Sequence, residues 1–182
     1  LSPPGSLSFV AGPTDASLHF MTIPQLLDRA LARHGSRDAA VFVAQNQRLS
    51  WYDLQQQADN MAAALLAMGI RRGNRVGIWS PNRLEWLLTQ FATARIGAVL
   101  VNINPAYKSS ELEYALNKVR CRMLVMARGY KSNNYLDTLR QLAPEIDRPG
   151  QAGDLTSLKL EHLKHVILLD DLSVPAHEAA KQ

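Results

Sequence analysis

The sequence predicts an α/β fold, in which a mostly parallel sheet is covered by helices on both faces in a doubly wound arrangement. Two observations predict it. Within residues 50–127, three segments with helical periodicity are each followed by a short apolar run. The connections are short, and helix–strand units joined in this way form parallel sheets with right-handed crossovers. With 182 residues, 47% of them hydrophobic and 20% charged, the chain has the size and composition of one globular domain.

The segment before the first unit is expected to hold an extended arm, one helix and a β-hairpin. Residues 1–21 are rich in Pro, Gly and Ser and show no apolar period. Thr22 suits a helix N-cap, and Gly35 ends the apolar period that follows it. Two β-like runs within residues 39–50 flank the polar turn 45–47, which predicts a short hairpin.

The first two units follow from their capping residues. Ser50 and Asp53 have the spacing of a capping box, so a helix is expected to begin here and to end at Gly69. An apolar strand over 75–80 follows. Asn82 is expected to cap the next helix, with Glu85 completing the box. The continuously apolar run 98–103 after this helix is typical of a strand covered on both faces.

The third unit and the C-terminal part complete the expected order of elements. Ser109 or Ser110 is expected to cap a helix that leads into a buried strand over 123–127. A short helix over 135–142, ended by Pro144, is followed by a surface loop over 145–157 and a last strand over 165–169. The polar end of the chain, residues 172–182, is expected to be a frayed tail.

The composition excludes several classes of protein. The net charge of +4 is modest, and the arginines are scattered along the chain. The basic stripe of a nucleic-acid-binding protein is therefore missing. No apolar run approaches the roughly 18 residues that span a bilayer. Residues 1–12 lack a basic leader, so no signal peptide is expected. The single cysteine, Cys121, excludes a disulfide within the chain and a cysteine-based metal cluster.

A doubly wound sheet binds ligands beyond the carboxyl ends of its strands. In this chain those ends are residues 80–82, 102–105 and 127–129. None of them carries a Gly-x-Gly-x-x-Gly fingerprint or a phosphate loop ending in Gly-Lys-Ser/Thr. Gly69 and Gly73 lie between a helix and a strand, at the wrong end of the sheet, and are interpreted as a helix stop and a turn.

The sequence gives little support for a metal site. His162 and His165 are spaced so that both could lie on one helix face, but two histidines do not make a zinc site, and loop or strand-edge positions are the favoured interpretation. Asp170 and Asp171 at a strand end could hold magnesium, although a polar turn is the more common role of such a pair.

The remaining polar candidates also have structural interpretations. Arg71, Arg72 and Arg75 surround a turn and could bind an anion, but a solvated turn is the simpler reading. Cys121 opens an apolar run, so a buried strand thiol is expected in place of a catalytic one. Core packing explains the tryptophans, which are Trp51, Trp79 and Trp86. From the residues alone, the chain is a scaffold without a chemical site.

Six stretches of the chain resemble the N-terminal part of the adenylate-forming superfamily, which contains acyl-CoA synthetases, peptide-synthetase adenylation domains and luciferases. They are Leu-Ser-Trp-Tyr-Asp-Leu (49–54), Ala-Ala-Leu-Leu-Ala-Met-Gly (63–69), Arg-Gly-Asn-Arg-Val (72–76), Pro-Asn with Glu-Trp (81–86), Thr-Ala-Arg-Ile-Gly-Ala-Val-Leu-Val-Asn-Ile-Asn-Pro (93–105) and Glu-Leu-Glu-Tyr-Ala-Leu (111–116). The pairing of 104–107 with 111–114 is most similar to fatty-acyl-CoA synthetases, in particular to the medium-chain branch. Asn74 departs from the usual Asp, in a turn where Asn can substitute.

The resemblance implies that residues 22–171 are the N-terminal subdomain, an incomplete domain, of an ATP-dependent fatty-acid–CoA ligase. Such an enzyme uses ATP and Mg²⁺ to form an acyl-adenylate and then transfers the acyl group to CoA. The family's phosphate loop, its adenine- and ribose-binding motifs and its catalytic lysine do not occur in these 182 residues. No catalytic, cofactor-binding or metal-binding residue is therefore assigned to this chain, and the chain alone is expected to be inactive.

Two other functions remain open from the sequence. The scaffold could serve as a non-enzymatic protein-association module, or it could belong to an adenylation module for amino or aryl acids. The resemblance implies fatty acid, ATP and CoA as partners of the parent enzyme. A bacterial cytoplasm is the expected location, and a mitochondrial matrix also fits.

Overall fold

The core of the molecule is a four-stranded parallel sheet with the order β4-β3-β5-β8. The computed structural model describes residues 12–13, 15, 20–147 and 154–169. The strands of this sheet are β3 (Arg75–Trp79), β4 (Val99–Asn102), β5 (Cys121–Met126) and β8 (His165–Leu168). All three strand pairs are parallel, as the helix–strand units predict.

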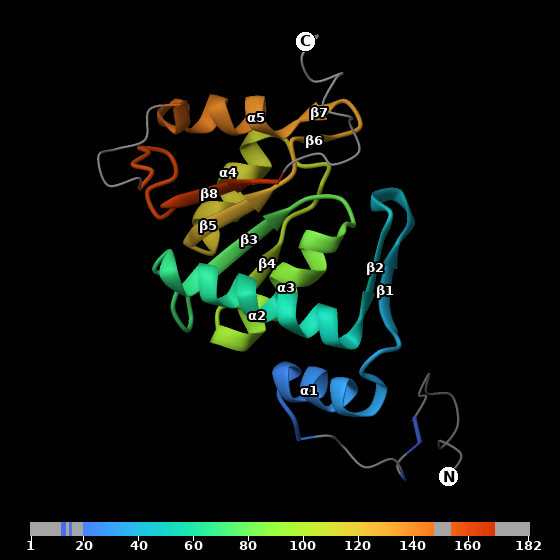
Figure 1. Cartoon of the computed structure of the whole chain (residues 1–182). Helices are drawn as coiled ribbons and strands as arrows, with labels where there is room; N and C mark the ends of the chain where they lie inside the picture. The colour runs from blue at the N-terminus through green and yellow to red at the C-terminus, as the bar shows by residue number, and fades with distance from the viewer. Residues whose placement is uncertain (1–11, 14, 16–19, 148–153, 170–182) are drawn as a thin grey trace, which may run out of the picture.

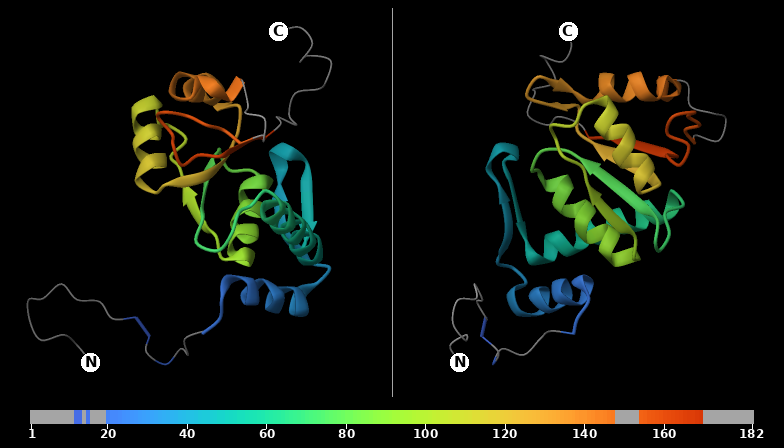
Figure 2. Two further views of the ribbon diagram at one scale, coloured as in Figure 1. Left: turned by 90° about the vertical axis from the view of Figure 1, so that its left-hand side faces the viewer. Right: turned by 180° about the vertical axis from the view of Figure 1, so that it is seen from behind.

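Helices cover both faces of the sheet, as Figures 1 and 2 show. The helices α2 (Trp51–Ala67) and α3 (Leu84–Ile96) pack on one face. The helices α4 (Ser109–Lys118) and α5 (Tyr135–Leu142) pack on the other. The predicted doubly wound α/β class is therefore confirmed.

Successive residues of β5 supply the two cores, because side chains alternate across a strand. Leu124 and Met126 belong to the cluster beneath α4 and α5. Met123 and Val125 belong to the cluster beneath α2 and α3. All four side chains have 0% relative exposure, so β5 lies in the interior of the sheet.

The N-terminal part forms a third, smaller cluster against α2 and α3. It consists of α1 (Ile23–His34), the strand β1 (Asp38–Phe42), the 3₁₀ turn η1 (Val43–Gln45) and the strand β2 (Gln47–Ser50). The predicted hairpin is confirmed, and its turn is closed by Asn46 in the left-handed conformation at φ 49°. Thr22 caps α1 and Gly35 ends it, also as predicted.

The helix caps follow the sequence at Thr22 and Ser50 and depart from it at α3 and α4. Ser50 and Asp53 form the expected capping box of α2, with Asp53 N donating to Ser50 Oγ at 3.2 Å. The prediction that Asn82 caps α3 is wrong. Arg83 holds the N-cap position without a side-chain cap, and Gln45 Oε1 accepts from Leu84 N at 2.7 Å.

Glu85 consequently does not complete a box with Asn82. Its carboxylate accepts from Arg83 Nε at 2.6 Å and from Gln45 Nε2 at 3.1 Å. The start of α4 also differs from the prediction. Its N-cap position is Lys108, one residue before Ser109, and Lys108 N donates to Glu111 Oε2 at 2.8 Å.

Strand β4 is less enclosed than the apolar run 98–103 predicted. Val101 and Leu100 pack, partly buried, against the clusters on the two faces, but β4 is the edge of the described sheet. Val99 is 49% exposed and Asn102 is also exposed. An apolar run alone does not reveal which strand of a parallel sheet lies at its edge.

The C-terminal part contains short elements that the sequence analysis did not predict. A two-residue hairpin, β6 (Gly129–Tyr130) with β7 (Asn133–Asn134), precedes α5. The expected surface loop 145–157 begins within the 3₁₀ turn η2 (Pro144–Asp147) and includes the buried Leu155 and Ser157. Nearly all of the predicted arm 1–21 and all of the predicted tail 172–182 lie outside the described residues.

Candidate functional site

The topology places a candidate ligand crevice at the carboxyl ends of β3 and β5. Strand β3 lies between β4 and β5. The chain passes from β3 to β4 through α3 on one face, and from β4 to β5 through α4 on the other. In doubly wound sheets, ligands bind where the winding changes direction in this way.

An aromatic pair lies at the carboxyl end of β3. The rings of Trp79 and Tyr135 stack with centroids 3.7 Å apart and an interplanar angle of 12°. Trp79 Nε1 donates to Asn104 O at 3.1 Å, and the Tyr135 hydroxyl donates to Pro105 O at 2.9 Å. Both side chains have 0% exposure, so they fix the loop after β4 from inside the protein.

Other polar groups of this edge are also bonded to the protein. The Ser80 hydroxyl, which is buried, donates to Pro81 O at 2.9 Å. Asn133 Nδ2 donates to Tyr107 O at 3.0 Å, and Lys108 Nζ donates to Asn133 Oδ1 at 3.2 Å. These groups stabilise the connections between the strands and helices, and their hydrogen-bonding capacity is directed inward.

Charge at the start of α3 is balanced within the protein. Burial of the Glu85 carboxyl raises its pKa, but the hydrogen bonds from Arg83 and Gln45 outweigh this effect and hold the pKa of Glu85 below its ordinary value. Arg83 and Glu85 share two hydrogen bonds, of 2.6 Å and 3.0 Å. Glu85 therefore stays ionised at neutral pH, and its hydrogen bond to Gln45 anchors the hairpin turn.

The described residues of this edge do not fit the phosphates of a nucleotide. A phosphate site of this kind needs glycines whose backbone amides surround the anion. The glycine at the end of β5, Gly129, has a different role: a Cβ atom there would lie 2.6 Å from Asn133 O. Gly129 therefore permits the close approach of β6 and β7, and no chemical step is assigned to this edge.

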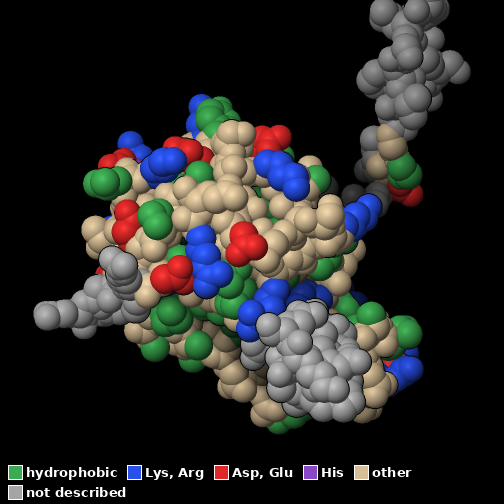
Figure 3. Space-filling model, turned by 90° about the horizontal axis from the view of Figure 1, so that it is seen from above, with side chains coloured by type: hydrophobic (Ala, Val, Ile, Leu, Met, Phe, Trp, Pro, Cys, Tyr) green, Lys and Arg blue, Asp and Glu red, His purple; other side chains and the backbone are tan. Residues whose placement is uncertain are grey.

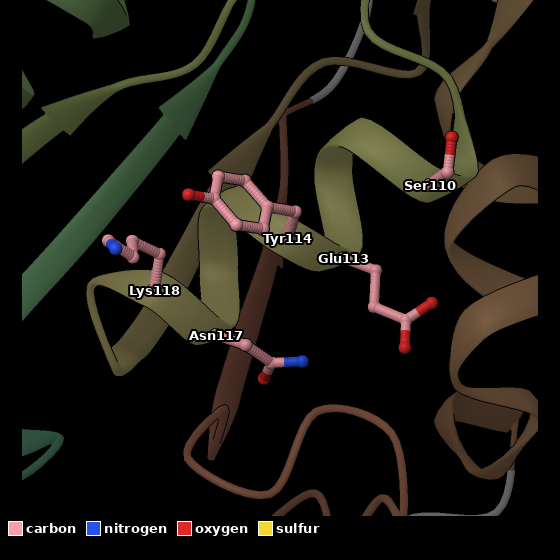
Figure 4. A pocket seen from close by; sticks show the side chains of 5 residues that line it. All are labelled: Ser110, Glu113, Tyr114, Asn117 and Lys118. Carbon is pink, nitrogen blue, oxygen red and sulfur yellow. The ribbon is translucent and has the colours of Figure 1, made fainter.

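A hollow of ≈480 Å³ lies along the outer side of α4 (Figure 4). Its lining side chains are Ser110, Glu113, Tyr114, Asn117 and Lys118. All five come from one helix, and Figure 4 shows that they point outward without converging on one point. Tyr114 is 67% exposed, and Asn117 Nδ2 donates to Lys159 O at 2.8 Å. The hollow is an open helix surface and not an enclosed catalytic site.

The upper face of the molecule carries mixed charge. Figure 3 shows basic and acidic side chains interspersed on it. On α5, Arg140 lies 3.0 Å from Asp147 and 3.5 Å from Asp137. Hydrogen bonding to Asp147 raises the pKa of Arg140. Such compensated charges produce little long-range attraction for an anionic partner.

Two of the three arginines around the turn before β3 bond to backbone carbonyls, and the third, Arg72, is exposed. Arg71 Nη1 donates to Leu66 O at 2.6 Å, and Arg75 Nη1 donates to Gly73 O at 3.0 Å. Gly69 and Gly73 have φ angles of 78° and 80°, which confirms their interpretation as a helix stop and a turn. This turn lies at the amino end of the sheet, opposite the candidate crevice.

The two histidines singled out in the sequence do not share a helix face. His162 lies in a turn with Nε2 3.1 Å from Glu161 Oε1, whereas His165 begins β8 with Nδ1 3.6 Å from Asp154 Oδ1. In the part of the chain that the structure describes, no group of three or more His, Cys, Asp or Glu side chains could hold a metal. Asp170 and Asp171 lie outside the described residues.

Cys121 is the buried strand thiol that the sequence predicts. Its relative exposure is 1%, and Sγ donates to Met123 O at 3.0 Å. Burial raises the pKa of the Cys121 thiol to about 11. A thiol with such a pKa is a poor nucleophile at neutral pH. Within the described residues, no helix has the length and apolar character needed to cross a bilayer.

The sequence matches the AMP-binding enzyme family over residues 27–182, which is most of the chain. This chain belongs to the AMP-binding enzyme family. The resemblance identified in the sequence is thereby confirmed. The family assignment and the described geometry agree on the α/β scaffold.

Similar proteins match most of this chain and are several times longer than it. The chain is 42% identical over 168 residues to the mitochondrial medium-chain acyl-CoA ligase ACSF2 of Mus musculus, and 36% identical over 154 residues to the putative acyl-CoA synthetase YngI of Bacillus subtilis. A fatty acyl-CoA synthetase structure from Mycobacterium tuberculosis shares the fold, with a TM-score of 0.63 and 22% identity over 84% of this chain and 27% of that chain. The mouse match covers 92% of this chain and 27% of the relative. The chain thus spans about a quarter of the length of its curated relatives.

Proposed function

We propose that this chain is the N-terminal part of an ATP-dependent fatty-acid–CoA ligase. The complete enzyme would convert a fatty acid, ATP and CoA into acyl-CoA, AMP and pyrophosphate through an acyl-adenylate. The observation that carries the proposal is the 42% identity to a medium-chain acyl-CoA ligase over 92% of this chain. Membership of the AMP-binding family supports the use of ATP, Mg²⁺ and CoA.

The groups that react belong, in this proposal, to the part of the enzyme outside this chain. The carboxyl edge of the sheet supports this division, because Ser80, Asn133 and Tyr135 bond to the protein's own carbonyls. Gly129 lacks a Cβ where β6 and β7 approach each other closely, so its role is in that contact. Residues 22–171 would supply a wall of the enzyme, and the chain alone would form no acyl-adenylate.

ATP–pyrophosphate exchange tests the proposal. We expect the complete protein to catalyse exchange with medium-chain fatty acids, and to lose it when EDTA removes Mg²⁺. The 182-residue chain is the matched control and should show no exchange. Exchange by this chain alone would refute the division of roles. A complete protein that exchanges only with amino or aryl acids would refute the fatty-acid assignment.

The location of the complete enzyme is a further part of the proposal. The relatives named above are a mitochondrial and a bacterial protein. A bacterial cytoplasm is the location we propose, with a mitochondrial matrix as the alternative. Cell fractionation followed by the same exchange assay distinguishes the two.

A further inference from the structure

Strand β4 has one paired side and one open side. Val99 N donates to Asn74 O at 2.8 Å and Ile103 N donates to Ile78 O at 3.0 Å, so these amides face β3. Because the backbone groups of neighbouring residues point to opposite sides of a strand, the amides and carbonyls of Leu100 and Asn102 face away from β3. In the described sheet, β4 pairs with β3 alone.

Among the residues that the structure describes, β4 carries no charge, proline or bulge to protect this open side. Edge strands are normally shielded by charged side chains, by proline, by a bulge or by a covering element. Residues 98–103 read Ala-Val-Leu-Val-Asn-Ile, with neither charge nor proline. The pairing of β4 with β3 runs without a register shift. Val99 is 49% exposed, although this composition is typical of strands inside a parallel sheet.

We propose that a further β-strand, from the part of the ligase outside this chain, pairs with β4 at Leu100 and Asn102. The proposal rests on the proposed function, because that function requires the missing part. A match of 168 residues that covers 27% of the mouse relative corresponds to a relative of about 620 residues, which exceeds a single domain. The remainder is long enough to supply such a strand.

A second copy of this chain is a poorer occupant of the edge. Strand β4 contains only four residues. Two such strands pairing edge to edge would bury far less than the roughly 1,600 Å² of a standard stable interface. A strand tethered within the same polypeptide pairs at high effective concentration and needs no large interface of its own.

Proline at Asn102 tests the pairing directly. The Asn102 side chain is exposed, so Asn102→Ala is a matched control for loss of the side chain. Asn102→Pro additionally removes the outward amide hydrogen, which a free edge tolerates and an interior strand does not. Val101→Pro, which removes an amide on the β3 side, is the positive control in both proteins.

In the complete ligase, we expect Asn102→Pro to lower the melting temperature of the unit containing the sheet by about 2–4 °C relative to Asn102→Ala, the effect of losing about one ladder hydrogen bond. In the 182-residue chain, the two variants should melt within about 1 °C of each other. Equal melting of both variants in the complete ligase would overturn the proposal. A lower melting temperature of Asn102→Pro in the 182-residue chain would also overturn the proposal. If that effect depends on protein concentration, a second copy of the chain pairs with the edge; if it does not, a segment of the same chain does.

Hydrogen exchange provides a second readout that does not depend on variants. The amides of Leu100 and Asn102 should exchange at least about tenfold more slowly in the complete ligase than in the 182-residue chain, while that of Val101 changes less. Equal exchange in the two proteins would overturn the proposal. Neither readout uses substrate, so a complete protein without ligase activity but with these amides protected would refute the function and leave the strand pairing supported.

Discussion

Replacing Tyr135 by phenylalanine isolates a single buried hydrogen bond. The hydroxyl donates to Pro105 O at 2.9 Å, and the ring stacks on Trp79. Phenylalanine retains the ring and its stacking but leaves Pro105 O with only the longer contact from Asn133 Nδ2, at 3.5 Å. Loss of one such bond destabilises a protein by about 1 kcal/mol, which lowers the melting temperature of a chain this size by about 2–4 °C.

The same substitution has a distinctive pH dependence. Burial, with a smaller contribution from Tyr130, raises the pKa of Tyr135 from 10.0 to about 12. The folded state therefore holds the phenolic proton more tightly than the unfolded state. The stability that this group contributes is fully present below pH 10 and is lost as the pH rises from 10 to about 12. Phenylalanine cannot ionise, so ionisation at position 135 does not lower the stability of the variant above pH 10.

Urea unfolding of both proteins between pH 7 and pH 11.5 measures the effect. We expect the wild type to be more stable at pH 7 and its advantage to shrink as the pH rises above 10. Taking the difference between the two proteins cancels the titration of Cys121, which both contain. A constant difference across the range would refute a buried, neutral Tyr135, and a variant as stable as the wild type at pH 7 would refute the hydrogen bond.

The remaining predictions concern the centre of the sheet. A Cβ atom at Gly77 would lie 3.0 Å from Ile103 Cδ1 and 3.2 Å from Leu124 Cδ1, so Gly77→Ala should destabilise the chain by about 1–3 kcal/mol through overpacking, measured by chemical unfolding. A stability equal to the wild type would contradict the tight packing. With its pKa at about 11, the Cys121 thiol should be ionised in only about one molecule in a thousand at pH 8. A disulfide reagent should therefore label Cys121 in the native protein only as fast as the protein unfolds around it, and should label the urea-unfolded protein at once. Rapid labelling of the native chain would contradict the burial of Cys121.

Features encoded by neighbouring residues could be predicted from the sequence. The caps Thr22 and Ser50 lie three residues from the groups that they bond. The helix stops at Gly35 and Gly69 were equally visible. The doubly wound class followed from the periodicity and the short connections, because those patterns also arise within each unit.

Features that depend on the tertiary arrangement could not be predicted in this way. Asn82 has the residue type and spacing of a cap for α3, yet Gln45 supplies the hydrogen bond to Leu84 N. The exposed edge at β4 depends on strand order, which the apolar run 98–103 does not encode. Two-residue strands such as β6 and β7 are too short to produce a period.

The candidate site shows the same division. The carboxyl edge of the sheet was the predicted location because topology alone places it there. The side chains that fill this edge could not be predicted, since Trp79 and Tyr135 come from separate elements and no sequence spacing links them. A tryptophan at the end of a strand was a usable signal, because a buried indole nitrogen requires an acceptor and here finds Asn104 O.

The hydrogen bond between Gln45 and α3 links two segments that lie far apart in the sequence, and we expect them to open together. The cap of α3 comes from Gln45 in the turn of the hairpin, which accepts from Leu84 N. Gln45 also donates to Glu85, which lies in the first turn of α3. If the hairpin detaches, the amide of Leu84 loses its acceptor, so we expect the start of α3 to fray with it. Local opening of the hairpin would then reach the helix that lies against the centre of the sheet.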